Sequence, residues 1–442
     1  MRISNLWIPL YLFACLVLGG ASNAGFLANA LLQLAGAILI GWALWKPVDS
    51  PLQERARPLY SLLVAVVLLV LLQFVPVPEA LWEVSPGRAE LAAEAAAIGI
   101  AYKPLLWALS PYEALMSAVW LMPAIALALA LLRLPNWQPQ HLAWAIIAGM
   151  VLSVILGAVQ LGQGQSSPAY FYTNTNRGST VGFFANSNHL ATLLLASIPF
   201  IAALTGQHLN TGREQYRLPV VLVSIGLMIV ALFGIAVNGS LAGFSLIGPV
   251  LAASAMILVT RSSVRRAALV LLPFVLAGGL GWMLLTDEGA KLLVFEDMES
   301  SAGSRQEIWQ TTARAISDHM PMGSGLGTFA EVYRRYENPT DVADFYINHA
   351  HNDYLELLLE LGIVALPVFL VFLFWWARIL VRVWLSEGGN PFAFAGAIVS
   401  GTILIHSIVD YPLRTAAISS VFAVSLCLMI LSRRFSGRAG TA

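Results

Sequence analysis

Charged residues are scarce in this sequence. Only 11% of its 442 residues are Asp, Glu, Lys or Arg, whereas 58% are apolar. A soluble domain usually carries about 25% charged residues, and a soluble core of this size needs a charged shell that this chain cannot supply. Because the formal net charge is also zero, no basic or acidic bias indicates nucleic acid or an acidic substrate as a partner.

Cysteine is almost absent as well. The two cysteines, Cys15 and Cys427, lie inside apolar runs near opposite ends of the chain, which argues against a disulfide framework. The sequence also lacks internal repeats, Ser/Gly linkers and low-complexity tracts. The simplest division is therefore a single membrane domain over residues 1–442.

Long apolar runs fill most of the chain. Most of them reach the length needed to cross a hydrocarbon core about 30 Å thick. The predicted fold is all-α, a polytopic transmembrane helical bundle with about twelve spans. The expected spans are 6–20, 25–45, 58–75, 112–132, 141–160, 188–206, 218–237, 242–260, 267–286, 354–377, 391–409 and 415–432.

The arginines indicate how the bundle is oriented. With the N-terminus in the cytoplasm, most arginines of the short loops fall on the inner side, and most outer ones gather in one long loop, about 287–353. Long loops cross a membrane largely regardless of charge. We therefore expect both termini in the cytoplasm. Residues 21–24 resemble a signal-peptidase site, but removal of the first helix would upset this charge pattern.

Three outer segments, 76–111, 161–188 and 287–353, are too long to be simple connectors. The first contains an Ala-rich stretch at 89–97 between tryptophans. That composition suits a helix lying at the membrane interface. We expect the three segments together to form a site on the outer face.

The second outer segment combines Gln, Ser, Thr and Asn with the aromatic residues Tyr170, Phe171 and Tyr172. Amide and hydroxyl groups beside aromatic faces are what a sugar-binding surface needs. Any solvated loop contains the same residue types, so both interpretations stay open.

The third outer segment predicts a helix. Ser304, with Glu307 three residues later, is a capping-box pattern that marks a helix start. The apolar residues from Ile308 to Ile316 recur at helical spacing, so this helix is expected to lie against the membrane or the bundle. The run 323–327 is rich in glycine but follows no strand, and we interpret it as a turn.

Polar residues then run directly into an apolar span. On a helix, Asn352, Glu356 and Glu360 fall four residues apart and share a face. Carboxylates that enter a bilayer are costly, so they are expected to point into the bundle or a wet cavity. The alternative is an interfacial helix cap followed by glutamates that reach back to the surface.

The histidines do not form a metal motif. His349 and His351 are two residues apart, and no third His or Cys stands at ligand spacing. His189 at the start of another span is more typical of a helix cap than of a catalytic residue. His406 and Asp410 predict a polar pair, but a pore or proton path needs more such groups.

Three blocks of residues resemble the O-antigen ligase and O-antigen polymerase superfamily. In chain order they are Phe184-Ala-Asn-Ser-Asn-His189, Gly303-Ser-Arg-Gln-Glu-Ile-Trp309, and His351-Asn352 with Gly362 further on. Their order and spacing, the long outer loop and the Pro-rich start of the first outer segment all fit. The resemblance covers roughly residue 60 to the last span.

The resemblance implies a glycosyltransferase of the bacterial inner membrane, embedded in membrane lipid, with its site on the periplasmic face. Such enzymes take a glycan from undecaprenyl pyrophosphate and transfer it to a hydroxyl group, without a metal or other cofactor. A ligase uses lipid A–core as the acceptor, and a polymerase uses another lipid-linked glycan. A lipid pyrophosphate is already a good leaving group, so the protein must bind two phosphates and remove one proton.

The roles follow residue by residue from the resemblance. His351 is expected to be the general base, oriented by Asn352 or Glu356. Arg305 is expected to bind the pyrophosphate, because guanidinium groups grip phosphate oxygens and keep their charge. The candidate substrate-binding residues are Arg177, Asn186, Asn188, His189 and Arg414.

One turn departs from the family pattern. Members often carry an arginine after the seventh span in a Ser-Arg-Gly-like turn, but here the turn reads Asn238-Gly239-Ser240-Leu241. Either another cation, such as Arg177 or Arg414, takes its place, or the donor is held differently. The His-Asn block favours a ligase over a polymerase. A protein O-oligosaccharyltransferase and a transporter of lipid-linked sugars rank lower.

Overall fold

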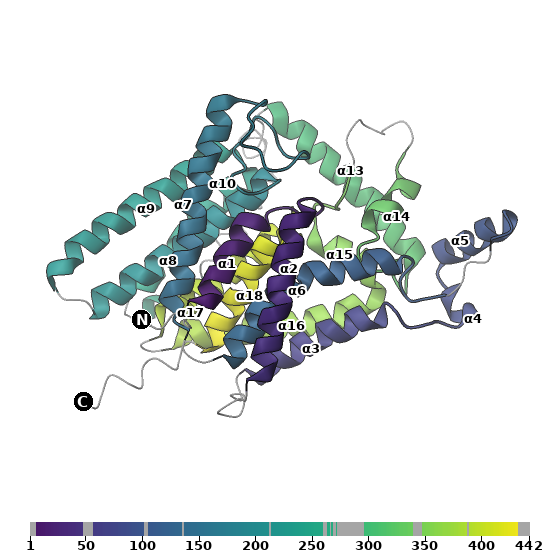
Figure 1. Ribbon diagram of the computed structural model, residues 1–442, viewed down its shortest axis with the longest axis horizontal. Helices are drawn as coiled ribbons and strands as arrows, with labels where there is room; N and C mark the ends of the chain where they lie inside the picture. Colours follow the sequence, from purple (N-terminus) through teal and green to yellow (C-terminus); the bar gives the residue numbers. More distant parts are fainter. Residues whose placement is uncertain are drawn as a thin grey trace.

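The computed structural model describes residues 6–46, 56–100, 105–134, 137–211, 214–259, 263–265, 267, 271, 296–338, 347–386 and 389–431. Within these ranges the chain is almost entirely helical (Figure 1). No strand occurs in them beyond two isolated bridges, which pair Gly20 with Phe184 and Pro76 with Leu106. The predicted all-α, polytopic helical bundle is confirmed.

The helices vary widely in length. In chain order they are α1 (Trp7–Leu18), α2 (Phe26–Trp45), α3 (Arg57–Leu72), α4 (Glu79–Trp82), α5 (Pro86–Ala97), α6 (Pro111–Arg133), α7 (Pro139–Gln163), α8 (Ser187–Thr211), η2 (Glu214–Tyr216), α9 (Arg217–Asn238), α10 (Leu241–Leu258), α13 (Glu296–His319), α14 (Phe329–Tyr336), α15 (Asp353–Leu361), η3 (Gly362–Val364), α16 (Ala365–Leu385), α17 (Pro391–His406), η4 (Pro412–Arg414) and α18 (Ala416–Leu431).

Seven helical segments among the described residues are long and apolar enough to cross a membrane. Six are the single helices α2, α6, α7, α8, α9 and α10, and the seventh joins α15 to α16. The shorter apolar helices α1, α3, α17 and α18 correspond to four more of the expected spans. The expected span 267–286 lies almost entirely outside the described residues, so the count of about twelve stays a prediction.

Helix α8 forms the centre of the bundle. Its apolar stretch is wholly buried, and it packs against α7, α9, α10 and α17. A helix that is apolar on all sides is stable only when neighbours cover every face. By contrast, large apolar side chains on α2, α9 and α16 are exposed, for example Ile38, Phe233 and Phe374, as expected of faces that meet lipid.

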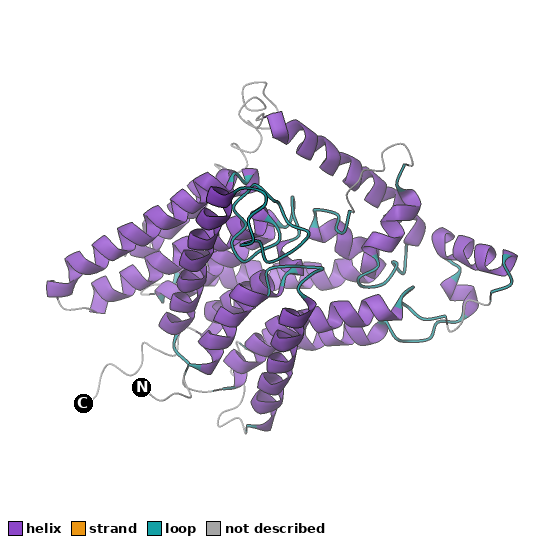
Figure 2. Cartoon of the chain, turned by 45° about the horizontal axis from the view of Figure 1, so that its top comes forward, coloured by secondary structure: helices purple, strands orange, loops and turns teal. Residues whose placement is uncertain are grey.

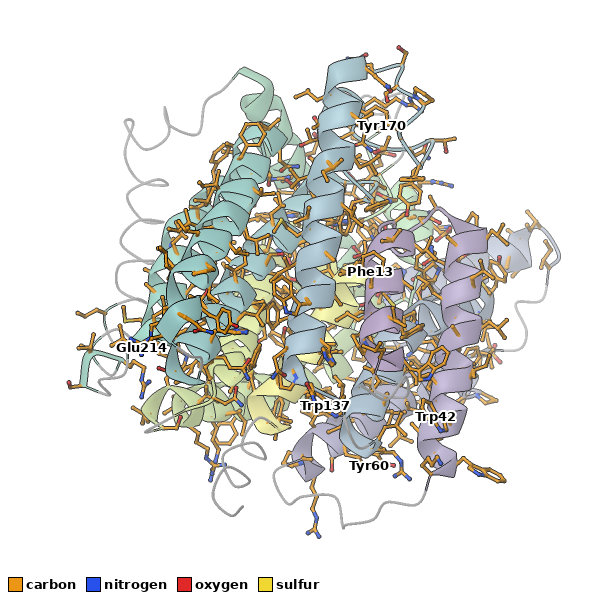
Figure 3. The ribbon with its side chains drawn as sticks, turned by 60° about the vertical axis from the view of Figure 1, so that its left-hand side comes forward. Phe13, Trp42, Tyr60, Trp137, Tyr170 and Glu214 are labelled. Atoms are coloured by element: carbon orange, nitrogen blue, oxygen red, sulfur yellow. The ribbon has the colours of Figure 1, made fainter. Side chains whose placement is uncertain are left out.

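The two ends of the bundle are easily told apart (Figure 3). Tyr170 lies at one end, and Trp42, Tyr60, Trp137 and Glu214 lie toward the other. We call them the Tyr170 end and the Glu214 end. Aromatic side chains are common at both boundaries of a membrane protein.

Three turns meet at the Tyr170 end. The backbone N–H of Ala185, in the loop between α7 and α8, donates to the carbonyl of Gly20 at 3.1 Å. The N–H of Ala417, at the start of α18, donates to the carbonyl of Gly19 at 3.0 Å. The turn between α1 and α2 therefore ties two distant segments together beside the site described below.

The segments predicted to face outward contain helices at the expected places, with one correction. The Ala-rich stretch 89–97 lies in α5, and the run 323–327 forms turns, as predicted. Helix α13, however, begins at Glu296, not at Ser304. The capping-box interpretation was wrong because the polar residues before Ser304 propagate the helix, and a single Gly303 inside it costs only about 1 kcal/mol.

The helical segment that starts at Asp353 breaks after two turns. Gly362 adopts a φ of +62° at the end of α15. A Cβ atom added there would lie 2.2 Å from the carbonyl oxygen of Pro321. Only glycine tolerates both the left-handed backbone and this close approach, so Gly362 holds α15 at its angle to α16.

We expect Gly362→Ala to destabilise the protein by about 2 kcal/mol, because alanine is disfavoured at positive φ and overlaps the Pro321 carbonyl. Thermal unfolding of the purified protein in detergent measures the effect. Gly226→Ala is the matched control, since Gly226 lies in α9 and a Cβ atom added there would meet no atom of another residue within 4 Å. Equal melting temperatures for the two variants would contradict this account of the break.

Candidate active site

Figure 2 shows loops crowded together at one end of the helices. Four histidines gather at the Tyr170 end of the bundle, each near the end of a helix. His189 begins α8, His349 and His351 precede α15, and His406 ends α17. The turn between α17 and α18 completes the group with Asp410 and Tyr411, whose contacts follow. Three segments far apart in the sequence therefore build one polar cluster.

Tyr411 holds three imidazole rings in place. Its ring centroid lies 4.9 Å from that of His189, 4.2 Å from His349 and 4.9 Å from His351. The ring is buried, and its hydroxyl oxygen accepts a hydrogen bond from Asn186 Nδ2 at 3.5 Å. A tyrosine is suited to this position because its body packs while its hydroxyl keeps a polar partner.

Asp410 is the negative centre of the cluster. Its Oδ1 lies 3.6 Å from His189 Nε2 and 3.7 Å from His351 Nδ1. The same oxygen accepts the backbone N–H of Tyr411 at 2.8 Å, and Asn188 Nδ2 donates to Oδ2. Burial acts to raise the pKa of Asp410, but the facing histidines hold it well below its usual range. The carboxylate therefore stays ionised at neutral pH.

His351 is held in an unusual backbone conformation. Its φ is +48°, which is uncommon outside glycine. The neighbours on both sides are fixed: the Ala350 carbonyl accepts from Trp309 Nε1 at 3.0 Å, and Asn352 Oδ1 caps α15 by accepting the N–H of Tyr354 and Leu355. Strain of this kind costs about 1–3 kcal/mol and clusters at functional sites.

The conformation of His351 determines what each ring nitrogen faces. The side chain is 26% exposed, the largest value among the three histidines that contact Tyr411. Nδ1 is buried and turned toward Asp410. This arrangement favours the tautomer with the proton on Nδ1, so that Nε2 carries the free lone pair.

Glu356 pairs with the other histidine of the block. His349 Nδ1 lies 2.8 Å from Glu356 Oε1, and the N–H of Ala350 donates to Oε2 at 2.9 Å. Burial lowers the pKa of His349, against the opposing effect of Glu356. The carboxylate that faces His351 thus belongs to Asp410, while Glu356 and Asn352 support the backbone around it.

Arg414 binds three buried carboxylates. Its Nη1 lies 2.9 Å from Glu360 Oε2 and 3.4 Å from Glu356 Oε1, and its Nε lies 3.6 Å from Asp353 Oδ1. The guanidinium is the one partner that all three share, and each carboxylate has a further donor from the protein. The predicted inward orientation of Glu356 and Glu360 agrees with their burial.

Arg305 approaches the cluster from α13. It precedes Trp309 by four residues, so the two side chains share a helix face, and Trp309 donates to the Ala350 carbonyl beside His351. The charge of Arg305 also acts on His406. Arg177 lies elsewhere on the same end: it is exposed, stacks over Tyr170 at 5.3 Å and donates to the Gln165 carbonyl.

The turn that lacks the expected arginine also reaches the cluster. Ser240 Oγ donates to Asn188 Oδ1 at 2.7 Å, and Asn188 in turn donates to Asp410. Asn238 Nδ2 donates to the carbonyls of Thr180 and Ser187 at 2.7 and 3.0 Å. Hydroxyl and amide groups therefore connect the α9–α10 turn to the start of α8.

Sequence reasoning overlooked Asp410 and Tyr411 as site residues. It expected Asp410 to pair with His406, whereas the Asp410 carboxylate faces His189 and His351, and His406 Nδ1 lies 2.7 Å from Thr192 Oγ1. The signal in the sequence was an aspartate next to an apolar span. Across the described residues, no group of three or more His, Cys, Asp or Glu side chains is arranged to hold a metal ion.

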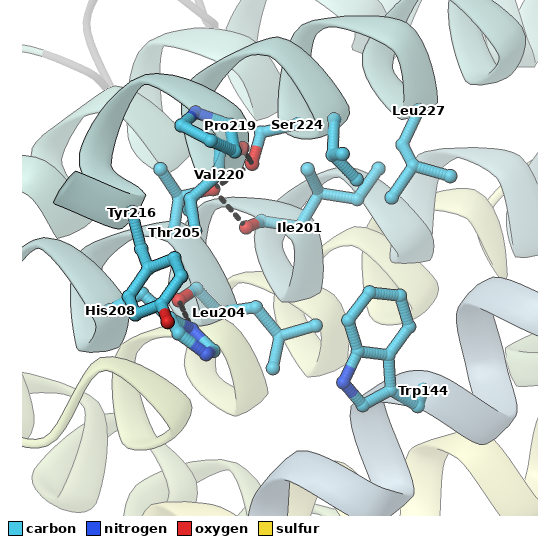
Figure 4. Close-up of a pocket in the computed structure, with 11 residues that line it drawn as sticks. Trp144, Ile201, Leu204, Thr205, His208, Tyr216, Pro219, Val220, Ser224 and Leu227 are labelled. Carbon is cyan, nitrogen blue, oxygen red and sulfur yellow. Dashed lines mark hydrogen bonds between the residues drawn. The ribbon is translucent and has the colours of Figure 1, made fainter. Parts of the chain in front are cut away.

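A separate cavity of about 430 Å³ lies toward the Glu214 end, between α7, α8 and α9 (Figure 4). Its walls include Trp144, Leu204 and Val220, with His208 and Tyr216 also lining it. Ile201, the first α8 residue of the cavity wall, follows His189 by 12 positions, which is about 18 Å along the helix. The cavity is mainly apolar and does not belong to the candidate site.

Part of the chain that builds this site is similar to a known protein family. The family model described as O-antigen ligase matches residues 223–370, about a third of the chain. Residues 223–370 of this chain are therefore similar to the O-antigen ligase superfamily. No curated protein matches it in sequence.

This superfamily comprises glycosyltransferase-like membrane enzymes of bacteria, whose substrates are lipid-linked glycans. The matched O-antigen ligase segment contains Arg305, His351 and Glu356. His189 and Asp410 lie outside it. The fold therefore completes the cluster with residues from both sides of the matched segment.

We expect Arg414→Gln to destabilise the protein by about 3–5 kcal/mol, because removal of a largely buried cation leaves its carboxylate partners uncompensated. Arg335→Gln is the matched control. Arg335 binds Glu94 with two hydrogen bonds of 2.8 and 3.0 Å, but both side chains are at least a third exposed, so its loss should cost less than about 1 kcal/mol. Thermal unfolding in detergent compares them, and similar melting temperatures would refute the role of Arg414.

Proposed function

We propose that this protein transfers a glycan from undecaprenyl pyrophosphate to a hydroxyl group of lipid A–core, as an O-antigen ligase of the bacterial inner membrane. The observation that carries the proposal is the pair formed by His351 and Asp410, in a superfamily that acts on lipid-linked glycans. A partly exposed imidazole backed by a buried carboxylate is suited to accept a proton from an alcohol.

The proposed reaction is a single displacement. The acceptor oxygen attacks the anomeric carbon of the first sugar, and the bond from that carbon to the phosphate oxygen breaks. The bonding electrons leave on undecaprenyl pyrophosphate, while the hydroxyl proton passes to Nε2 of His351 and then to solvent. Asp410 stabilises the imidazolium that forms, because its carboxylate faces Nδ1.

Arg305 is the proposed ligand of the pyrophosphate. It lies on the same face of α13 as Trp309, which contacts the His351 segment, and a guanidinium matches the geometry of phosphate oxygens. Arg177 is a candidate for a second contact farther out. Arg414 is a weaker candidate, because three carboxylates already share its charge.

Asn186, Asn188 and His189 are proposed to line the substrate side of the cluster. Their positions at the start of α8 place them beside Asp410 and Tyr411. The distribution of arginines supports a periplasmic Tyr170 end with both termini in the cytoplasm. On that orientation, the donor enters from the outer leaflet and the acceptor from the periplasm or the same leaflet.

We expect His351→Asn and Asp410→Asn to lower the transfer rate by about 10²- to 10⁴-fold, the usual contribution of a general base. Asparagine tolerates the positive φ of His351 but offers no basic nitrogen. The assay uses purified protein with an undecaprenyl-pyrophosphate glycan and lipid A–core. His208→Asn, at the Glu214 end, is the matched control and should retain activity.

The same assay distinguishes the competing activities. Transfer only to lipid A–core supports a ligase, and lengthening of the donor glycan without it supports a polymerase. Wild-type rates in folded His351→Asn and Asp410→Asn would refute the proposed base. Folded wild-type protein that transfers to neither acceptor would refute both activities.

We expect Arg305→Ala to raise the KM for the lipid-linked donor at least tenfold, because a charge-assisted contact to phosphate contributes about 1.5–3 kcal/mol. Arg314→Ala on the same helix is the control: Arg314 is exposed and donates to Thr311 Oγ1. Steady-state kinetics at varied donor concentration give the KM. An unchanged donor KM in Arg305→Ala would remove Arg305 from the site.

A further inference from the structure

The loop between α7 and α8 presents one aromatic side chain to solvent and buries its two neighbours. Tyr170 and Tyr172 are buried, while Phe171 between them is 63% exposed. The Tyr170 hydroxyl donates to the Ser179 carbonyl at 3.0 Å and accepts the N–H of Gly178 at 2.9 Å. Because adjacent side chains of an extended segment point to opposite sides, anchoring both tyrosines turns Phe171 outward.

Gln160 of α7 holds the loop on both sides of Phe171. Its buried amide donates to the carbonyls of Ala169 and Gly182 at 3.1 and 2.9 Å, and accepts the N–H groups of Val181 and Gly182 at 3.1 and 2.9 Å. Four hydrogen bonds from this one side chain hold the start of the loop, at Ala169, close to its end, at Val181 and Gly182. Phe171 is therefore displayed on an ordered support, which lowers the entropic cost of binding a ligand.

The exposed ring packs on a second aromatic residue, Phe183, which begins the segment leading to α8. Phe171 stacks on Phe183 with ring centroids 5.5 Å apart and planes inclined by 21°. Nearby, the N–H of Asn176 donates to the Ala185 carbonyl at 3.2 Å, and its Oδ1 accepts the N–H of Ser187 at 3.0 Å. This loop thus lies directly against the segment that leads to Asn188 and His189.

The surroundings of Phe171 are polar. Gln165, Thr173, Asn174 and Arg177 in the same loop are all exposed, which distinguishes it from the lipid-facing aromatic residues of α9 and α16. A sugar ring offers flat C–H faces that pack on aromatic rings, and hydroxyl groups that pair with amides and hydroxyls. The combination suits a carbohydrate better than an acyl chain.

We propose that Phe171 and Phe183 form a platform on which the donor glycan stacks, at sugars beyond the one joined to pyrophosphate. The inference rests on the proposed function, since the reacting first sugar must lie at His351. The platform then selects donors by the glycan they carry, separately from the groups that bind pyrophosphate and remove the proton.

Donor kinetics test the platform. We expect Phe171→Ala to raise the KM for a donor with a complete glycan about tenfold, with kcat nearly unchanged, and Phe171→Trp to restore it. With a donor that carries only the first sugar, Phe171→Ala and the wild type should have the same KM. Phe26→Ala is the matched control, because Phe26 is also exposed, at the start of α2.

An equal KM for the complete donor in Phe171→Ala and the wild type would overturn the platform. An equal rise in KM for both donors in Phe171→Ala would also overturn it, since such a rise would indicate a structural defect. Equal effects of Phe171→Ala and Phe26→Ala would indicate an interfacial membrane contact instead.

A binding measurement separates this inference from the proposed function. Mild acid releases free glycan from the lipid-linked pool of the source bacterium, and saturation-transfer NMR detects its contact with aromatic protons of the purified protein. We expect transfer to the glycan in the wild type and its loss in Phe171→Ala. A saturation-transfer signal from wild-type protein that lacks transferase activity would support the platform and refute the proposed function. The absence of this signal from active wild-type protein would overturn the platform and leave the proposed function intact.

Discussion

The structure of the site depends on one largely buried cation, Arg414, among three buried carboxylates. Arg414 joins Glu356 and Glu360 of α15 to the turn between α17 and α18, and Glu360 also accepts the N–H of Gly327 in the turn after α13. Buried carboxylates without a partner are costly. The pairing with Arg414 therefore holds α15, the turn between α17 and α18 and the turn after α13 together. Glu356 in turn pairs with His349 and accepts the backbone N–H of Ala350, so it fixes the backbone beside His351.

A second constraint positions the proposed base. Asp410 and Tyr411 lie in one short turn, yet they contact histidines from the start of α8 and from the segment before α15. The strained backbone of His351 persists because its neighbours are hydrogen bonded on both sides. Hydrogen bonds therefore hold the groups proposed for proton removal. Arg305 lies on α13 and Phe171 on the loop before α8, the two elements proposed to bind the phosphates and the sugars of the donor.

Much of the fold was predictable, and the site only in part. The apolar runs predict the helices because lipid leaves a spanning backbone few other ways to satisfy its hydrogen bonds. The His351–Asn352 block and the buried Glu356 and Glu360 were recognised because polar residues are rare at the mouth of an apolar span. Asp410 looked like a partner of His406, since helical spacing carries no information about residues that approach from other segments.

The sequence by itself determined that the chain is a helical membrane protein, that its polar residues concentrate in long segments between spans, and that it resembles the O-antigen ligase superfamily. These conclusions follow from composition, run length and local motifs, which are properties of neighbouring residues. Only the tertiary structure decided that Asp410 faces His351, that Glu356 serves His349, and that Arg414 is shared by carboxylates. His351 and Asp410 are 59 positions apart and Arg414 and Glu360 are 54 apart, whereas His349 and Glu356 are seven apart. In each case the packing of the helices and their connecting segments sets which side chains meet.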